Sequence, residues 1–170
     1  MSTTTPTYLD QARTIYADDP RARFEIKDIY QPLYPDDPYD IVFNCNVLVH
    51  LPDFRSPLRN LLESTRTVCI VRTLMGEHTT KVKRAIIPDL DACGEPVDYS
   101  YLNTWARQHL MDFAADLGWR SEHIEDQFDA SVLADEHGTL KKGRGTRVVD
   151  GHQMDGLLTM NWEWLKFTRA

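Results

Sequence analysis

A short apolar run that stops at three small polar residues most constrains what this chain can fold into. Residues 41–43 are continuously apolar, and Asn44, Cys45 and Asn46 follow them directly. Such a run is typical of a strand in a parallel sheet whose two faces are both covered. Ligands of open parallel sheets bind beyond the carboxyl ends of the strands. The three polar residues are therefore candidates for a binding site.

The rest of the chain predicts helices and strands that alternate through its middle. Apolar spacing indicates three helices, the second capped by Ser56 and the third stopped by Gly118. These helices cover residues 8–16, 57–62 and 102–117. Apolar runs and alternation indicate strands over residues 23–29, 41–43, 68–71, 119–125 and 158–167. This order predicts an α/β fold: an open, mainly parallel sheet with helices on both faces and a C-terminal antiparallel strand pair.

The length of 170 residues suits a single domain with a sizeable core. We expect a flexible N-terminus over residues 1–7 and one α/β domain over residues 8–170. A polar insertion is expected at about residues 126–153, with a short ordered segment at 146–149. Residues 86–87 predict a short strand or a cover for the core.

The charge and the cysteine content argue against some classes of binding partner and indicate a cellular location. The net charge of −7 and the pI near 5.3 argue against nucleic acid or an anionic membrane as a partner. The cysteines, Cys45, Cys69 and Cys93, are odd in number and far apart, which favours reduced thiols and a cytoplasmic location. No apolar stretch approaches the roughly 18 residues of a membrane span. The histidines show no metal-ligand spacing, so no metal site is expected.

Two further side chains are candidates for chemistry. Asp28 ends the predicted strand at residues 23–29, where a carboxylate can accept hydrogen bonds from an amine or a hydroxyl. His50 is the candidate for a general base. Each also has an ordinary structural explanation, because Asp at a strand end commonly caps a turn and His commonly packs or caps. Their combination with Asn44 to Asn46 is more specific than any one of them.

The segments "RFEIKDI", "YDIVFNCNVLVHLPD" and "LRNLLESTRTVCIVRTL" together resemble the class I S-adenosylmethionine-dependent methyltransferases, which are Rossmann-like. The likeness covers roughly residues 8–125 and 155–169, including a terminal antiparallel strand pair. It implies that S-adenosylmethionine (SAM) is the cofactor. The residues that it matches to the cofactor site are Asp28 and Ile29, beside the adenine, and Asn44, Cys45 and Asn46, along the methionine arm. Tyr39-Asp40 matches the start of the family's fourth strand, and Leu48 to Leu51 matches a Leu-x-His-Leu element.

The Gly-rich loop that follows the first strand in that family has no counterpart before Asp28. The first two strands and the first helix of the family also have no match, so the chain resembles a truncated methyltransferase. Three outcomes are open: the third strand pairs directly with the fourth, which we favour, a complementing chain supplies the missing half, or two copies join through their open strand edges.

The resemblance implies a SAM-dependent methyltransferase, or part of one, that acts on an unknown methyl acceptor. SAM is expected to bind only if the site is completed. The alternative is a non-catalytic, methyltransferase-like binding or regulatory subunit, which the absence of the Gly-rich loop favours. Tyr99, Tyr101 and Trp105 are candidates for the mouth of a substrate site, although the helical spacing of Trp105 favours a core position.

Overall fold

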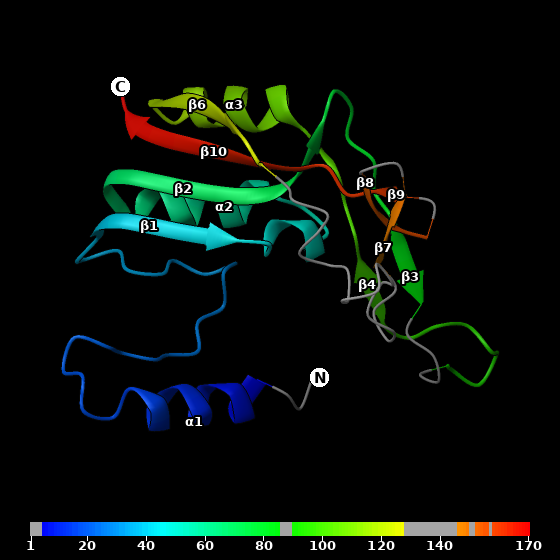
Figure 1. Cartoon of the computed structure of the whole chain (residues 1–170), viewed down its shortest axis with the longest axis horizontal. Helices are drawn as coiled ribbons and strands as arrows, with labels where there is room; N and C mark the ends of the chain where they lie inside the picture. Colours follow the sequence, from blue (N-terminus) through cyan, green and yellow to red (C-terminus); the bar gives the residue numbers. More distant parts are fainter. Residues whose placement is uncertain (1–4, 86–89, 128–145, 150–151, 157) are drawn as a thin grey trace.

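The computed structural model describes residues 5–85, 90–127, 146–149, 152–156 and 158–170. Its helices are α1 (Thr5–Ile15), the 3-10 helix η1 (Leu48–His50), α2 (Arg55–Glu63) and α3 (Arg107–Asp116). Its strands are β1 (Tyr39–Cys45), β2 (Thr65–Gly76), β3 (Lys83–Ala85), β4 (Tyr99–Tyr101), β5 (Trp105–Ala106), β6 (Trp119–Glu125), β7 (Thr146–Val149), β8 (His152–Asp155), β9 (Leu158–Thr159) and β10 (Trp162–Arg169). Figure 1 shows these elements around one central sheet, with α1 set apart from it.

The central sheet has the order β1-β2-β10-β6, with β5 beside the end of β2. β1 and β2 run parallel, with Ile41 opposite Val68 and Phe43 opposite Ile70. β10 lies antiparallel to both β2 and β6 (Figure 1). The prediction of an open α/β sheet that ends in an antiparallel strand pair is therefore confirmed.

Among the described residues, α2 and α3 pack on the same face of this sheet and share one core. The core joins their buried side chains to those of β2 and β10, and its centre is formed by Leu58, Leu62, Val71, Leu110, Leu165 and Phe167. Burial alternates along β10, because only every second side chain points toward the helices. The sequence predicted helices on both faces of the sheet. α2 and α3 cover one face, and neither of them covers the other.

Two small sheets lie beside the end of β2. β3 pairs with β4, and β7, β8 and β9 form a second antiparallel sheet. An ion pair of 2.9 Å between Arg84 and Asp155 joins the two. β7 confirms the ordered segment expected at residues 146–149, whereas residues 128–145 of the expected insertion and residues 86–87 lie outside the described residues.

The strand predicted over residues 23–29 does not form, and this prediction is wrong. The segment is extended but pairs with no strand among the described residues, and Ile26 is 63% exposed. Its direct pairing with β1, the outcome that we favoured from the sequence, is therefore absent. A single extended segment without hydrogen-bonded neighbours gains nothing from its alternating pattern.

Helix ends and the last strand also differ from the sequence predictions. α3 begins at Arg107, not near residue 102, because Trp105 belongs to β5; that residue is buried all the same. Gly118 ends the helix as expected, with a left-handed φ of 80°. α2 starts before Ser56 and has no side-chain cap, so the predicted cap is wrong. The final strand is split into β9 and β10.

Candidate functional site

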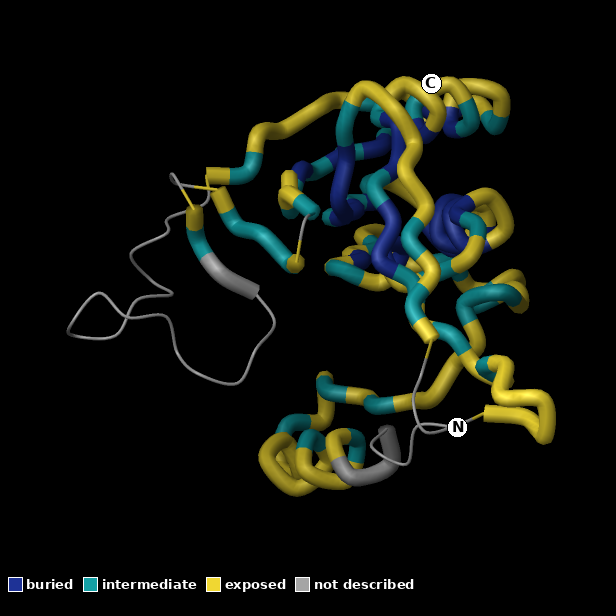
Figure 2. The backbone as a smooth tube through the Cα atoms, turned by 90° about the vertical axis from the view of Figure 1, so that its right-hand side faces the viewer, coloured by how far each residue is buried: buried dark blue, intermediate teal, exposed yellow. Residues whose placement is uncertain are grey.

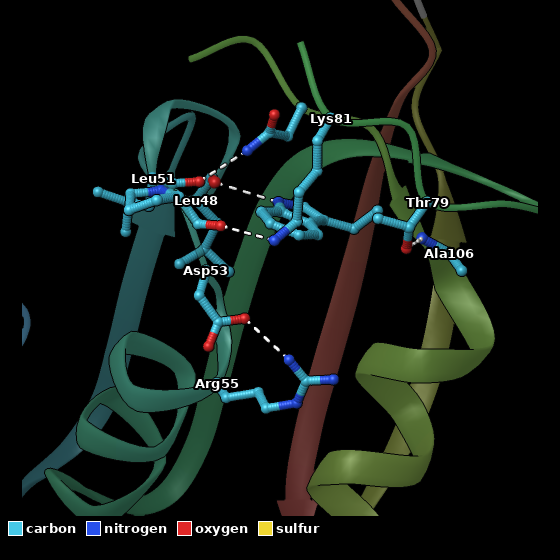
Figure 3. Close-up of polar contacts among 10 residues, drawn as sticks. Leu48, Leu51, Asp53, Arg55, Thr79, Lys81 and Ala106 are labelled. Atoms are coloured by element: carbon cyan, nitrogen blue, oxygen red, sulfur yellow. Dashed lines mark hydrogen bonds and ion pairs between the residues drawn. The ribbon is translucent and has the colours of Figure 1, made fainter. Parts of the chain in front are cut away.

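The loop after β1 is held in place by side chains from a distant part of the chain. The carbonyl oxygens of Leu48 and Leu51 accept hydrogen bonds from Trp105 Nε1 at 3.1 Å and Asn103 Nδ2 at 2.7 Å (Figure 3). The Lys81 ammonium donates to a third carbonyl of this loop at 2.8 Å. Trp105 and Asn103 are themselves buried, so the loop rests on ordered partners.

The three polar residues at the end of β1 point in different directions. Asn44 lies on the helix-covered face and is 7% exposed, and its Oδ1 is buried without a hydrogen-bond partner. Cys45 is exposed. Asn46 has a left-handed φ of 60°, which Asn tolerates better than most residues, and its Oδ1 accepts from Arg72 Nη1 at 2.9 Å. The structure thus leaves Asn44 as the acceptor that lacks a donor.

Asp28 lies at a turn instead of at a strand end. One of its carboxylate oxygens accepts from the Tyr30 backbone N–H at 2.9 Å, so the side chain stabilises the turn. The next residue, Ile29, packs against the core, and its carbonyl accepts from Asn60 Nδ2 at 2.8 Å. The turn is therefore fixed against α2, on the face of the sheet to which Asn44 also points.

Tyr30 connects this turn to the loop after β1. Burial raises the pKa of its hydroxyl, and the charges of Asp53, Asp28 and Tyr101 act in the same direction, while the Asp53 backbone opposes them. The contact with that backbone falls outside hydrogen-bond geometry, and the hydroxyl oxygen is buried without a partner. Tyr30 thus lies between the Asp28 turn and the loop after β1.

His50 is exposed at the rim where β1 ends and has a defined orientation. Its Nδ1 lies 3.0 Å from the Tyr101 carbonyl oxygen. Because a carbonyl oxygen can only accept, Nδ1 carries the proton and Nε2 keeps its lone pair in the neutral ring. The geometry is compatible with a general base at Nε2. Tyr101 contributes its backbone here, not its ring.

Sequence reasoning missed two residues near this rim, Asn103 and Tyr30. Asn103 donates to Leu51 and accepts from the Val82 N–H at 3.0 Å, which fixes the loop to the strand β4 region. Tyr30 was not singled out, although it stands two residues after Asp28. The sequence carried no signal for Asn103, because a hydrogen bond to a residue 52 positions away leaves no local pattern. It carried none for Tyr30 either, because the burial of that ring depends on the fold.

Several hollows on the described surface lie beside α1. One of about 380 Å³ is lined by six residues of the N-terminal segment: Tyr8, Leu9, Ala12, Glu25, Ile26 and Lys27. Neither Asp28 nor Asn44 lines it. The described residues contain no group of three or more His, Cys, Asp or Glu side chains placed to hold a metal ion. They also contain no helix long and apolar enough to span a bilayer.

The fold is similar to those of solved SAM-dependent methyltransferases. The chain superposes on a putative SAM-dependent methyltransferase from Listeria monocytogenes with a TM-score of 0.55 and 11% identity, over 99% of this chain and 77% of that one. The glycopeptide N-methyltransferase MtfA, solved with SAM, gives 0.54 and 11%, over 100% and 70% of the two chains. DhpI, solved with SAH, gives 0.54 and 14%, over 95% and 60%.

At these identities the likeness concerns the fold. This chain spans 60% of the length of DhpI, so a large part of that protein has no counterpart in it. No family model matches the sequence, and no curated protein matches it either.

Proposed function

We propose that this chain, which has the fold of the SAM-dependent methyltransferases, is such an enzyme or part of one, and acts on a methyl acceptor of unknown structure. The observation that carries the proposal is the rim at the carboxyl end of β1. There the Asp28 turn, the unpartnered Asn44 oxygen and His50 are held by contacts with α2 and with Asn103. Ligands of sheets of this kind bind at that rim.

The residues at the rim fit one side of SAM. Asn44 Oδ1 is a buried acceptor that lacks a donor, and an ammonium or amine group of a ligand would satisfy it. Asp28 is exposed and has a second carboxylate oxygen that can accept from an amino group. Asn46 is less suited, because its side-chain oxygen already accepts from Arg72. Cys45 lies exposed and Ile29 packs against the core beside Asp28.

Methyl transfer from SAM requires little of the protein beyond orienting the two reactants. Bound SAM supplies a methyl group on a positively charged sulfur, which a nucleophile with a free lone pair can take. The rim would hold the acceptor in line with that methyl group and exclude water, which is where most of the rate of such reactions arises. His50 Nε2, whose lone pair is free while Nδ1 donates to Tyr101, would take the proton that an acceptor hydroxyl or amine gives up.

A specific observation favours the alternative, a non-catalytic binding or regulatory subunit. The chain spans only 60% of the length of DhpI, and the sequence has no Gly-rich loop ahead of Asp28. A site built from the residues of this chain alone would enclose a ligand on one side only. The two functions differ in whether SAM binds and turns over.

Calorimetric titration of the full chain with SAM and with SAH separates them. We expect binding, and we expect Asn44→Leu to weaken it by about 1–3 kcal/mol, or roughly 5- to 150-fold, as the loss of a buried hydrogen-bond acceptor implies. Asp28 is exposed, so we expect Asp28→Ala to weaken it by less, about 0.5–1.5 kcal/mol. Asp18→Ala, an exposed carboxylate outside the site, is the matched control. Absence of heat with the chain alone, and also with any protein that co-purifies with it, would leave only the non-catalytic function.

Methyl transfer gives a separate readout for His50. If the side chain is a base, His50→Gln lowers the rate of transfer and leaves the affinity for SAM unchanged. An equal loss of affinity and rate would mean that the residue only supports the loop.

A further inference from the structure

The guanidinium of Arg72 joins residues that follow two different strands of the central sheet. Arg72 lies on β2 next to Val71, which faces the helices, so the Arg72 side chain points to the opposite face. Its Nη1 donates to Asn46 Oδ1 at 2.9 Å, directly after β1. Its Nε donates to Asp126 Oδ2 at 2.8 Å, directly after β6, and Nη2 donates to the same oxygen. One side chain of β2 thus connects the ends of β1 and β6.

Arg72 is itself held in place by several contacts. Its guanidinium carbon lies 4.5 Å from the centre of the Trp162 ring and 5.4 Å from that of Trp164, and both rings belong to β10. The Arg72 and Asp126 side chains are 17% and 16% exposed, so solvent and salt screen their ion pair little. Figure 2 shows buried and half-buried residues gathered around the central sheet, and Arg72 is half-buried. A guanidinium that is already stacked and paired loses little further freedom when it binds Asn46.

The residue that Arg72 binds has an unusual backbone conformation. Of the described residues other than glycine, only Asn46 has a left-handed φ, which is 60°. This conformation costs free energy in any residue that has a Cβ atom. Two hydrogen bonds to Arg72 offset that cost: the Asn46 side chain accepts from the guanidinium, and the Asn46 N–H donates to the Arg72 carbonyl at 2.9 Å. Arg72 therefore holds Asn46 through both its side chain and its backbone.

The conformation of Asn46 sets how the chain passes from β1 to η1. Two residues further on, the Leu48 carbonyl accepts from Trp105 Nε1, so the turn is fixed at its end as well as at its start. Asn44 precedes Asn46 by two residues, and His50 follows it by four. A change of φ at Asn46 would rotate the end of β1 relative to η1. It would therefore move Asn44 relative to His50.

We propose that Arg72 is a positioning residue, which holds Asn46 in the left-handed conformation that places Asn44 and His50 relative to each other. Asp126 in turn holds the guanidinium. Arg72 acts through Asn46, from the face of the sheet opposite to the one to which Asn44 points. Its effect on SAM binding rests on the proposed function, whereas its hold on the turn does not.

A double-mutant cycle between Arg72 and Asn46 tests the proposal. Glycine adopts a φ of 60° without a bound side chain, so the loss of Arg72 should matter much less when residue 46 is glycine. In calorimetric titration with SAH, we expect Arg72→Met to weaken binding about tenfold in the native background, as the loss of a hydrogen bond to a charged group implies. In the Asn46→Gly background we expect a loss of less than about twofold. An equal loss in both backgrounds, or none in either, overturns the proposal.

Amide hydrogen exchange followed by NMR gives a readout that does not depend on SAH. Arg72→Met should speed the exchange of the Asn46 N–H about tenfold. The buried Ser64 N–H, which donates to the Asn60 carbonyl at 3.1 Å at the end of α2, should keep its native rate. Faster exchange at both amides would mean a general loss of stability and would overturn a local role.

The exchange measurement also separates the two proposals. If the native chain gives no heat with SAH, the proposed function fails, and hydrogen exchange alone decides on Arg72. Faster exchange at Asn46 but not at Ser64 then supports its hold on the turn, and unchanged exchange at Asn46 overturns it.

Two further variants separate the turn from the ion pair. Arg72→Met leaves the Asp126 carboxylate without this partner, so Arg72→Met/Asp126→Asn removes the stranded charge and should give the same losses. A return to native behaviour would assign the effect to the carboxylate and overturn the proposal. Arg169→Met is the matched control, because Arg169 lies 4.7 Å from the centre of the Trp119 ring and donates to the Thr65 carbonyl at 3.2 Å, at the opposite end of β2. This variant should keep the native affinity for SAH and the native exchange rate in the turn, and a loss equal to that of Arg72→Met would count against a specific role of Arg72.

Discussion

A bidentate ion pair between Arg107 and Glu163 links α3 to the sheet, and its loss should be costly. Glu163 lies on β10 and is 5% exposed. It accepts from Arg107 Nε at 2.6 Å and Arg107 Nη2 at 2.7 Å, a bidentate pair, and it also contacts His123 at 3.0 Å. Arg107→Met keeps most of the stem of the side chain but leaves the carboxylate without its main partner.

The structure sets the size of this loss. Breaking a buried ion pair by removing one partner costs about 3–5 kcal/mol of unfolding free energy. The Arg107 side chain is 38% exposed, and His123 and Asn161 remain beside the carboxylate. Both facts reduce the penalty, so we expect Arg107→Met to cost about 2–3 kcal/mol. Urea unfolding followed by tryptophan fluorescence measures it.

A matched exposed pair gives the control. Lys166 and Glu122 lie 2.8 Å apart with side chains 37% and 61% exposed, so Lys166→Met should cost less than about 1 kcal/mol. Equal losses for the two variants would refute the argument, because burial of Glu163 would then add nothing to the pair.

The same pair predicts a pH dependence with a defined sign. Burial alone raises the pKa of Glu163, but the hydrogen bonds and charge of Arg107 outweigh it, with smaller contributions from His123 and Asn161, and lower the pKa below the ordinary 4.5. A carboxyl group whose pKa is lower in the folded chain stabilises the fold at pH values above its pKa in the unfolded chain. That stabilisation is lost as the pH falls through its pKa in the folded chain. The difference in stability between the native chain and Arg107→Met should therefore shrink below about pH 4.5. A difference that is constant from neutral to acidic pH would contradict this.

Two further predictions concern single residues. Gly118 has a φ of 80° and open space around it, so Gly118→Ala should cost about 1–2 kcal/mol through backbone strain alone, and Gly118→Asn should cost less; denaturant unfolding compares them. Cys45 and Cys93 are exposed, whereas burial raises the pKa of the Cys69 thiol to about 12. A thiol reagent at neutral pH should therefore modify two of the three cysteines in the folded chain and the third only on unfolding, and rapid modification of all three would be inconsistent with the buried position of Cys69.

Much of the central sheet could be predicted from local sequence. Residues 41–43 and 68–71 mark β1 and β2, because short continuous apolar runs are typical of strands in a parallel sheet. The expectation that both faces of β1 are covered is wrong, since Ile41 and Phe43 are exposed. The strand at residues 119–125 follows from the stop at Gly118, and β6 has those bounds. The antiparallel pairing of β6 with β10 was also predicted, since no helix separates the last two strands of the main sheet.

Prediction failed where an element depends on a neighbour. Residues 23–29 alternate like a strand, yet alternation stabilises a strand only when hydrogen-bonded partners lie on its edges, and none lies there among the described residues. Trp105 fits a helical stripe but forms β5, because its indole N–H reaches the Leu48 carbonyl and its backbone pairs with β2. Tertiary contacts of this kind override helix periodicity.

For the candidate site, the sequence alone determined which residue types stand after β1 and around residue 28, since their identities and spacing are local. The tertiary structure decided what each is free to do. It committed the Asn46 side chain to Arg72, one Asp28 oxygen to the turn and His50 Nδ1 to Tyr101, and it left Asn44 buried without a donor. The physical reason is that a polar group's availability depends on which partners the fold brings to it, and those partners come from segments far apart in the chain.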